Sequence, residues 1–302
     1  MASDHVLAID FGTANSYFCK CASDKTTPTR VDFGDGRDGL ATAILYRKDR
    51  RPLVGHMATE EYGEASKEER LNYVLRTQFK PDILISDEAR RNTVDFLRTV
   101  LEEAKGQHLD LDPASREVIF GVPSEANARY KAVLADSAKE AGYGLIKMVD
   151  EPTGALLYHV AHKDIPARNA LSGVLVVDFG GGTCDFAYML RGKLCGNPWG
   201  DMELGGRLYD DLFYQWFLDQ NPEAEAALLE SGDAYFVRFH LCREVKEFFS
   251  RTMARDRSEV VSKAIGSYGK LTGMTWDAFM ERSRNYRPSP ACQRGLADTQ
   301  ST

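Results

Sequence analysis

Short apolar runs around glycine turns mark two places that lie far apart in the chain. The runs at residues 6–11 (VLAIDF) and 16–21 (SYFCKC) flank the turn Gly12-Thr13-Ala14-Asn15, which predicts a β-hairpin. Residues 174–190 (VLVVDFGGGTCDFAYML) repeat the order of strand, glycine turn and strand. The shared Asp-Phe-Gly core recurs 168 positions later, which indicates duplication of one unit.

Between the two hairpins, helical and strand patterns alternate, as in an α/β fold. Ser124 is expected to cap one of the helices and Gly142 to end it. Pro152 suits a first helical turn, because its missing N–H has no partner there. The predicted elements are helices over 58–78 and 88–106, a strand over 117–123, a helix over 124–142, a strand over 145–150 and a helix ending near 163.

The second half is predicted to be mainly helical after its hairpin. Turn chemistry at 164–172 marks the boundary between two lobes, and helical patterns fill most of 206–256 and return at about 275–283. The last stretch has no periodicity and is predicted to be irregular. The expected domains are a first lobe over 1–167 with a helical insertion at about 40–115, a second lobe over 168–284, and a tail over 285–302.

Composition and charge limit the classes of function. A chain of 302 residues with 43% hydrophobic content is long enough for about two domains. Its formal net charge of -7 gives no general attraction to nucleic acid or anionic lipid, so neither is an expected partner. Without a leader pattern or an apolar run of roughly 18 to 20 residues, a cytoplasmic location is expected. Six sparse cysteines without a C-x-x-C pair favour reduced thiols over zinc sites or disulfides.

The two glycine turns carry the candidate chemistry. Small turn residues let backbone N–H groups and a hydroxyl approach phosphate oxygens, and an aspartate beside the turn suits Mg²⁺, which prefers carboxylate, phosphate and water oxygens. One such turn is weak evidence for phosphate binding, but one in each half of the chain is far more specific. The two sets are Asp10 with Gly12, Thr13 and Ala14, and Asp178 with Gly180, Gly181, Gly182 and Thr183.

Several segments together resemble the heat-shock-protein-70 (DnaK-type) ATPase domain. AIDFGTANS is similar to the first phosphate motif of that family, VDEPTGALLY to its first connecting motif and VVDFGGGTCDFAYM to its second phosphate motif. IFGVPSEANARYKAVLADSAKEAGY and LGGRLYDDLF match further segments, so the resemblance covers residues 5 to about 282. It implies an actin-like ATPase fold with duplicated ribonuclease-H-like lobes, ATP or ADP as the bound nucleotide, and Mg²⁺.

The resemblance also implies roles for individual residues. Phosphoryl transfer requires mainly charge neutralisation and an in-line water, which agrees with this set. Asp10 and Asp178 are implied to bind Mg²⁺ through its water shell, and Thr13 and Thr183 to present hydroxyls to the terminal phosphates. Glu151 and Asp185 are implied to lie near the attacking water. The glycine pair Gly205 and Gly206 is implied to lie near the sugar and phosphates, and Lys246 to contact the adenosine.

Structural alternatives remain for several of these residues. Glu151 can simply favour the helix that begins near Pro152, Thr183 can be a plain strand residue, and Gly205 and Gly206 can form only a turn. The family has a lysine near the γ-phosphate, but the register around LNYVLRTQFKPD is ambiguous. Lys80, Arg76 or neither can serve there.

Two departures from the family pattern stand out. Glu247 occupies the position where the family usually has an arginine that packs on the base, so adenine stacking is expected to be weaker. After MTWDAFMERSR, neither a second connecting motif nor a glycine-rich adenosine motif follows. We therefore expect an incomplete second lobe without a peptide-binding domain, from truncation, a frame-shift or natural shortening. Absence of an adenosine motif in any reading frame of the downstream DNA would count against a frame-shift.

These observations favour a heat-shock-protein-70-like module that binds ATP and hydrolyses it slowly. The other hypotheses are a nucleotide-binding scaffold without turnover, an actin-like bacterial cytoskeletal protein and, with the least support, a sugar kinase. Asp185 favours the heat-shock class over the cytoskeletal one, whose members usually have a glutamate there. Co-chaperone or client proteins are expected partners by analogy alone, and the sequence leaves the oligomeric state open.

Overall fold

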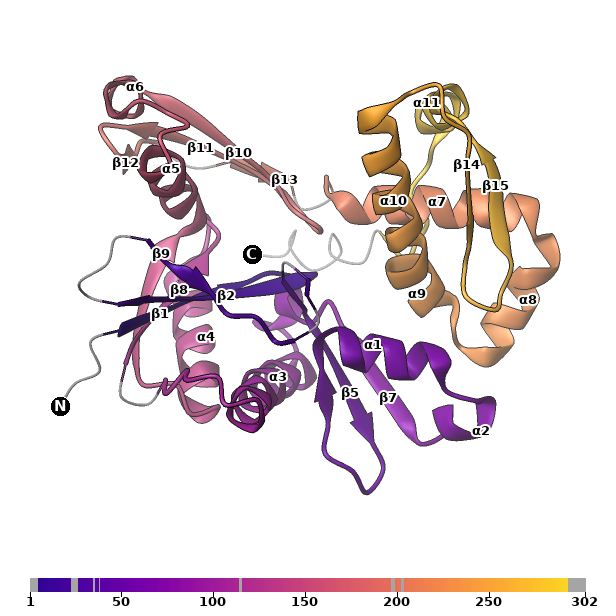
Figure 1. The fold of residues 1–302 in the computed structure, drawn as a ribbon, viewed down its shortest axis with the longest axis horizontal. Coiled ribbons are helices and arrows are strands. Elements are labelled where there is room, and N and C mark those ends of the chain that lie inside the picture. Colours follow the sequence, from indigo (N-terminus) through magenta and orange to yellow (C-terminus); the bar gives the residue numbers. More distant parts are fainter. Residues whose placement is uncertain are drawn as a thin grey trace. The chain divides into compact units, whose positions relative to one another are not determined.

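The computed structural model describes residues 5–22, 27–34, 36–37, 39–113, 116–196, 199–201 and 204–292 (Figure 1). By its internal contacts the chain forms two compact units. The first unit is Met1–Asp178 with Asp185–Gly200, and the second is Phe179–Cys184 with Asp201–Thr302. This division differs from a boundary near residue 167, which concerns the duplicated lobes and stays a prediction. Residues 293–302 of the expected tail lie outside the described residues.

The first unit is built on a six-stranded mixed sheet, with strand order β3-β2-β1-β8-β9 and β4 paired to β2. The predicted hairpin is confirmed, because β1 and β2 pair antiparallel from His5↔Ala22 to Phe11↔Ser16. On its other edge β1 runs parallel to β8, and β8 runs parallel to β9. The strand bounds are β1 His5–Phe11, β2 Asn15–Ala22, β3 Thr29–Arg30, β4 Leu40–Ala41, β8 Glu117–Val122 and β9 Leu145–Asp150.

A smaller sheet lies within the segment predicted as a helical insertion, and it corrects the predicted helix over 58–78. Helix α1 (Gly55–Glu64) is followed by α2 (Lys67–Arg70), but Tyr73–Thr77 then forms strand β7, which pairs antiparallel with β5 (Ala43–Arg47). Strand β6 (Leu53–Val54) pairs with the other edge of β5. The helix ends early because the segment YVLRT, with β-branched and aromatic residues, gains cross-strand partners.

Two helices contribute to the hydrophobic core of the first unit. Helix α3 (Asp87–Gly106) confirms the prediction over 88–106, and it packs against α4 (Ala128–Glu140). The cap of α4 is Asn127, whose side chain accepts a hydrogen bond from the Tyr130 N–H, so the predicted cap at Ser124 is wrong. An amide oxygen in the Asx position can satisfy the first-turn donors as a serine would. The rings of Phe11, Phe79 and Phe96 join the hairpin to α3, with centroids 5.9–6.2 Å apart.

The second hairpin follows two helices. Helix α5 (Glu151–Ala161) is where it was predicted, but Ala167–Ser172 forms helix α6 instead of a turn. Buried Ala170 explains the difference, because α6 covers the apolar face of the sheet that follows. That sheet has the order β10-β11-β12, with β13 paired to β11. Its strands are β10 Val174–Phe179, β11 Cys184–Leu190, β12 Lys193–Leu194 and β13 Trp199–Asp201.

The second unit is mainly helical, as predicted, and it also contains the hairpin β14–β15, which the sequence patterns did not predict. Rings of Phe213, Phe249 and Phe279 meet in its core with centroids 5.5–6.1 Å apart. In the described part of the chain, no helix combines the length and apolarity that a membrane crossing requires. The elements are α7 Gly206–Gln220, α8 Pro222–Ser231, α9 Ala234–Phe236, the π-helix η2 Val237–Leu241, α10 Cys242–Arg255, β14 Val261–Ala264, β15 Lys270–Met274 and α11 Trp276–Asn285.

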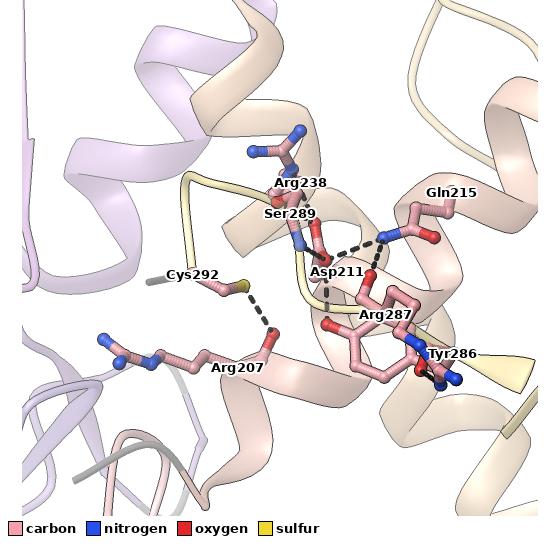
Figure 2. Close-up of polar contacts among 8 residues, drawn as sticks. All are labelled: Arg207, Asp211, Gln215, Arg238, Tyr286, Arg287, Ser289 and Cys292. Atoms are coloured by element: carbon pink, nitrogen blue, oxygen red, sulfur yellow. Dashed lines mark hydrogen bonds and ion pairs between the residues drawn. The ribbon is translucent and has the colours of Figure 1, made fainter. Parts of the chain in front are cut away.

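The described part of the predicted tail is irregular but firmly attached (Figure 2). Residues 286–292 return to α7, where the fully buried carboxylate of Asp211 accepts hydrogen bonds from the Tyr286 hydroxyl (2.8 Å) and from the backbone N–H (3.0 Å) and hydroxyl (2.7 Å) of Ser289. Arg238 from the π-helix forms an ion pair with the same carboxylate at 3.1 Å. One buried charge therefore joins three separate segments, namely α7, the π-helix and residues 286–292.

We predict that Asp211→Ala lowers the free energy of unfolding of the second unit by about 3–5 kcal/mol, because it leaves the Arg238 charge buried without its partner. Urea unfolding followed by tryptophan fluorescence measures this, since Trp216 and Trp276 lie in the second unit. Asp219→Ala on the same helix is the control. It removes an exposed ion pair to Arg282 (2.6 Å), which contributes about 1 kcal/mol or less. Equal effects of the two substitutions would refute the prediction.

Candidate functional site

Parallel strands bring three predicted residues to one edge of the first unit. Asp10 lies near the carboxyl end of β1, and Glu151 directly follows β9, so β8 between them places both ends on the same side. Lys80 begins the 3₁₀-helix η1 (Lys80–Asp82), and its side chain is buried. Its Nζ lies 3.4 Å from Oε1 of Glu151. A buried cation and a carboxylate are thus held together at the edge where α/β sheets bind ligands.

Thr42 fixes the first glycine turn, and sequence reasoning missed this residue. Its Oγ1 donates to the carbonyl of Gly12 at 2.8 Å, and its backbone N–H donates to the carbonyl of Ala14 at 2.9 Å. Thr42 is almost wholly buried, and its hydroxyl also lies 2.8 Å from that of Ser16. A side chain at Gly12 would collide with the carbonyl oxygen of Asn15. The turn therefore requires glycine and keeps Thr13 between two anchored neighbours.

Negative charge is in excess around Lys80. The surrounding protein raises the pKa of Asp10, although solvent still reaches this residue, and Asp178 raises it further while Lys80 lowers it. Burial likewise raises the pKa of Glu151, with Lys80 opposing the shift. Burial and then Asp185 raise the pKa of Asp178. Lys80 lowers the pKa of Asp10, Glu151 and Asp178 alike, so three carboxylates interact with this lysine, an arrangement that a bound cation would relieve.

This donor set fits Mg²⁺ held largely through water. Within the described residues, no three His, Cys, Asp or Glu side chains gather closely enough to hold a metal ion by themselves. Mg²⁺ commonly keeps several waters and takes only one or two carboxylates plus phosphate oxygens. Asp10 and Asp178, which interact electrostatically with each other, are suited to that mode.

In the second unit, two glycine motifs that are separate in the sequence pack together. The N–H of Gly206 donates to the carbonyl of Gly180 at 3.0 Å, and the N–H of Arg207 donates to that of Gly181 at 2.8 Å. A Cβ on Gly205 would collide with the backbone of Gly182. The turn 180–183 is closed by a hydrogen bond from the Gly180 N–H to the Thr183 carbonyl at 2.8 Å. The amino terminus of α7 therefore rests on the second glycine turn.

Lys246 of α10 reaches the same place. Its Nζ lies 2.6 Å from Oδ1 of Asp210 and 3.4 Å from the carbonyl of Gly206. Burial raises the pKa of Asp210 to about 6, although Lys246 lowers it. Glu247, which replaces the arginine usual in the family pattern, instead forms a 3.0 Å ion pair with Arg243 one turn earlier. The second unit thus combines a glycine turn, a helix amino terminus and a lysine.

Comparison with known proteins identifies the family. The family model described as "Hsp70 protein" matches residues 91–267, more than half of the chain. The chain belongs to the Hsp70 family. It is 24% identical over 259 residues to a chaperone protein dnaK of Guillardia theta, covering 75% of this chain and 39% of that one. It is 24% identical over 260 residues to the DnaK of Thermoplasma acidophilum, with 83% and 41% covered. This Hsp70 chain spans about two fifths of the length of these relatives.

Solved structures show that this Hsp70 chain has the actin-like ATPase fold. MreB5 of Spiroplasma citri bound to AMPPNP superposes with a TM-score of 0.60, 16% identity and coverage of 94% of this chain and 75% of that one. The ADP-bound form gives a TM-score of 0.52 and 20% identity, with 74% and 59% covered. The likeness supports the predicted fold class and indicates nothing finer at these identities.

The structure groups the residues predicted for an Hsp70 site as two sets, one in each unit. Asp10, Thr13, Lys80, Glu151, Asp178 and Asp185 belong to the first unit, and Gly180–Thr183, Gly205, Gly206 and Lys246 to the second. Of the two candidate cations, Lys80 contacts Glu151, whereas Arg76 forms an exposed 2.7 Å ion pair with Glu88. Glu151 is the first residue of α5, so its position at a helix start and its contact with Lys80 coexist.

We predict that Asp210→Asn removes part of the pH dependence of stability. Because the pKa of Asp210 is about 6 in the folded chain and about 3.8 in the unfolded one, the folded chain keeps a proton that the unfolded chain has released between these values. The contribution of this group therefore decreases as pH rises from 4 to 6, by on the order of 3 kcal/mol.

Urea unfolding of the wild type and of Asp210→Asn across pH 4 to 7 measures this contribution. As pH rises, the free energy of unfolding of the variant should increase relative to that of the wild type. Asp219→Asn, an exposed change on the same helix, should run parallel to the wild type. A constant difference between Asp210→Asn and the wild type over this range would disprove the assignment.

Proposed function

We propose that this Hsp70 chain binds ATP and ADP with Mg²⁺ and hydrolyses ATP slowly. The observation that carries the proposal is the repeated arrangement of an acidic strand end and an anchored glycine turn, with the buried Lys80–Glu151 pair beside the first one. Backbone N–H groups of such turns suit phosphate oxygens, and a charged lysine offsets their charge. The MreB5 structures with the same fold hold ADP and AMPPNP, which supports nucleotide as the ligand class.

Individual roles follow from position and charge. Asp10 and Asp178 would hold Mg²⁺, and Mg²⁺ would supply charge neutralisation of the phosphates when bound. The two glycine turns present donors to the phosphate oxygens of the nucleotide. These donors are the backbone N–H groups of Gly12 to Ala14 and of Gly180 to Thr183, with the hydroxyls of Thr13 and Thr183. Gly205, Gly206 and Lys246 lie at the second turn. By the family resemblance, the two glycines would lie near the sugar and phosphates of the nucleotide, and Lys246 would contact the adenosine.

Glu151 and Asp185 are the carboxylates that orient the attacking water. The raised pKa of Glu151 comes from burial, and Lys80 opposes it, so this carboxylate can accept a proton more readily than a solvated one. Lys80 itself stays charged. Burial would lower the pKa of Lys80, but the carboxylates of Glu151 and Asp10 raise it.

Chaperone activity is the finer part of the proposal. The two curated relatives compared above are described as DnaK chaperones, and this chain spans about two fifths of their length. We propose that nucleotide state controls the binding of client or co-chaperone proteins in the cytoplasm.

Two other functions have an observation in their favour. Actin-like assembly is favoured by the MreB5 fold, and light scattering that rises on addition of Mg-ATP would support it. A scaffold that binds nucleotide without turnover is favoured by Glu247, which pairs with Arg243. The family usually has an arginine at the position of Glu247, and that arginine would stack on the base.

We expect the chain to bind Mg-ATP in calorimetry and Asp178→Asn to weaken binding at least about tenfold, since the variant loses a charged partner of the ion and its waters. The loss should shrink when Mg²⁺ is replaced by EDTA, because the carboxylate then has no cation to hold. Asp164→Asn, an exposed change beside His159, is the control and should bind like the wild type. No binding by the wild type would contradict the proposed function.

Glu151→Gln should lower the steady-state turnover of ATP by about 100-fold or more, as expected for loss of a general base. Binding of Mg-ATP should persist, because the amide keeps the size of the side chain. Glu140→Gln, which is exposed at the end of α4, serves as control. If the wild type binds ATP but phosphate release stays at background in every chain, the scaffold function replaces the enzymatic one.

A further inference from the structure

Two buried hydroxyls in the first unit have no hydrogen-bond partner among the described residues. They are Oγ of Ser124 and the hydroxyl of Tyr130. Buried polar atoms nearly always pair with protein or ordered water, so each of these requires a partner from outside the described chain. Ser124 lies in the segment that joins β8 to α4, and Tyr130 lies in the first turn of α4. That connection begins at the carboxyl end of β8, the strand between β1 and β9. The sequence suggested Ser124 only as a helix cap and did not single out Tyr130.

Tyr130 is fixed in place beside the charged residues of the site. Its backbone N–H donates to Oδ1 of Asn127 at 2.8 Å, which sets the first turn of α4. Its phenol group interacts electrostatically with both Lys80 and Glu151. Burial raises the pKa of Tyr130, so the hydroxyl keeps its proton and can donate. The donor thus lies in the neighbourhood of a cation, where the expected acceptor is an anionic oxygen.

Other buried tyrosines of the same unit show that an unpaired hydroxyl is not the rule here. The Tyr46 hydroxyl donates to Asp95 at 2.9 Å and lies 3.0 Å from Oδ1 of Asn92. The Tyr143 hydroxyl donates to the carbonyl of Leu97 at 3.2 Å. These tyrosines serve the core, with protein acceptors supplied. Tyr130 differs in that its phenol group interacts electrostatically with Lys80 and Glu151.

We infer that Tyr130, together with Ser124, donates a hydrogen bond to an oxygen of the terminal phosphoryl group of a nucleoside triphosphate held beside Lys80. The inference rests on the proposed function and deepens it, because it assigns residues that separate a triphosphate from a diphosphate. Without nucleotide, water can accept the hydrogen bonds of these hydroxyls. Once the triphosphate is bound, they donate to a charged oxygen instead. Hydrogen bonds to charged groups are stronger than those to neutral ones.

The test is calorimetry with Mg-AMPPNP and Mg-ADP as two separate probes. Tyr130→Phe should weaken binding of AMPPNP about tenfold and leave binding of ADP within roughly twofold, because only the triphosphate has the oxygen in question. Ser124→Ala should show the same split to a smaller degree. Tyr143→Phe is the matched control, since it removes a buried tyrosine hydroxyl of the same unit that has a protein acceptor, and it should change both affinities equally or not at all.

Thermal unfolding of each variant without nucleotide separates a folding defect from a ligand effect. If Tyr130→Phe is too unstable to measure, Ser124→Ala decides the question with the same two probes. Unchanged AMPPNP binding in both variants, with a wild type that binds normally, would overturn this inference and leave the proposed function intact. A wild type that binds neither nucleotide would overturn both.

Discussion

The parallel pairing of β1 with β8 and of β8 with β9 is the constraint on which the first unit depends. Parallel strands end on the same side, so Asp10 and Glu151 meet although 140 residues of chain separate them. The β8–α4 connection begins at that edge, and η1 delivers Lys80 to it. The antiparallel partner β2 turns back at Gly12, which leaves the glycine turn beside the same residues. One sheet topology therefore places a lysine, two carboxylates and a glycine turn together.

Burial of charge is the second constraint, and it affects the two units differently. In the first unit, Asp10, Glu151 and Asp178 all have raised pKa values and only Lys80 opposes them, so the arrangement favours a bound cation. In the second unit, buried charges are neutralised by the protein itself, through Lys246 on Asp210 and Arg238 on Asp211. The first arrangement suits a ligand site, and the second provides support for a helix amino terminus.

Asp211 also explains how a segment without periodicity can be ordered. The residues from 286 to 292 have no helix or strand to satisfy their backbone, but Tyr286 and Ser289 share the acceptor capacity of a single carboxylate. Cys292 is buried at the end of the segment, and its thiol lies 3.7 Å from the carbonyl of Arg207. The contact attaches this segment to α7, the same helix whose first turn rests on Gly180 and Gly181.

The sequence by itself determined the elements whose signals are local. The glycine turns, the apolar periodicity of α3 and the repeated Asp-Phe-Gly core were sufficient to predict both hairpins and the main helices. The same motifs and the family resemblance selected the candidate site residues, whose roles stay predictions. Tertiary structure decided the rest. Tyr73–Thr77 became a strand because β5 offered an edge, and Lys80 was distinguished from Arg76 by its burial against Glu151. No local sequence signal marks Thr42, Tyr130 or Asp211. Thr42 and Asp211 matter through contacts with distant segments, and Tyr130 through a buried hydroxyl without a partner among the described residues, and both arise only when the chain packs.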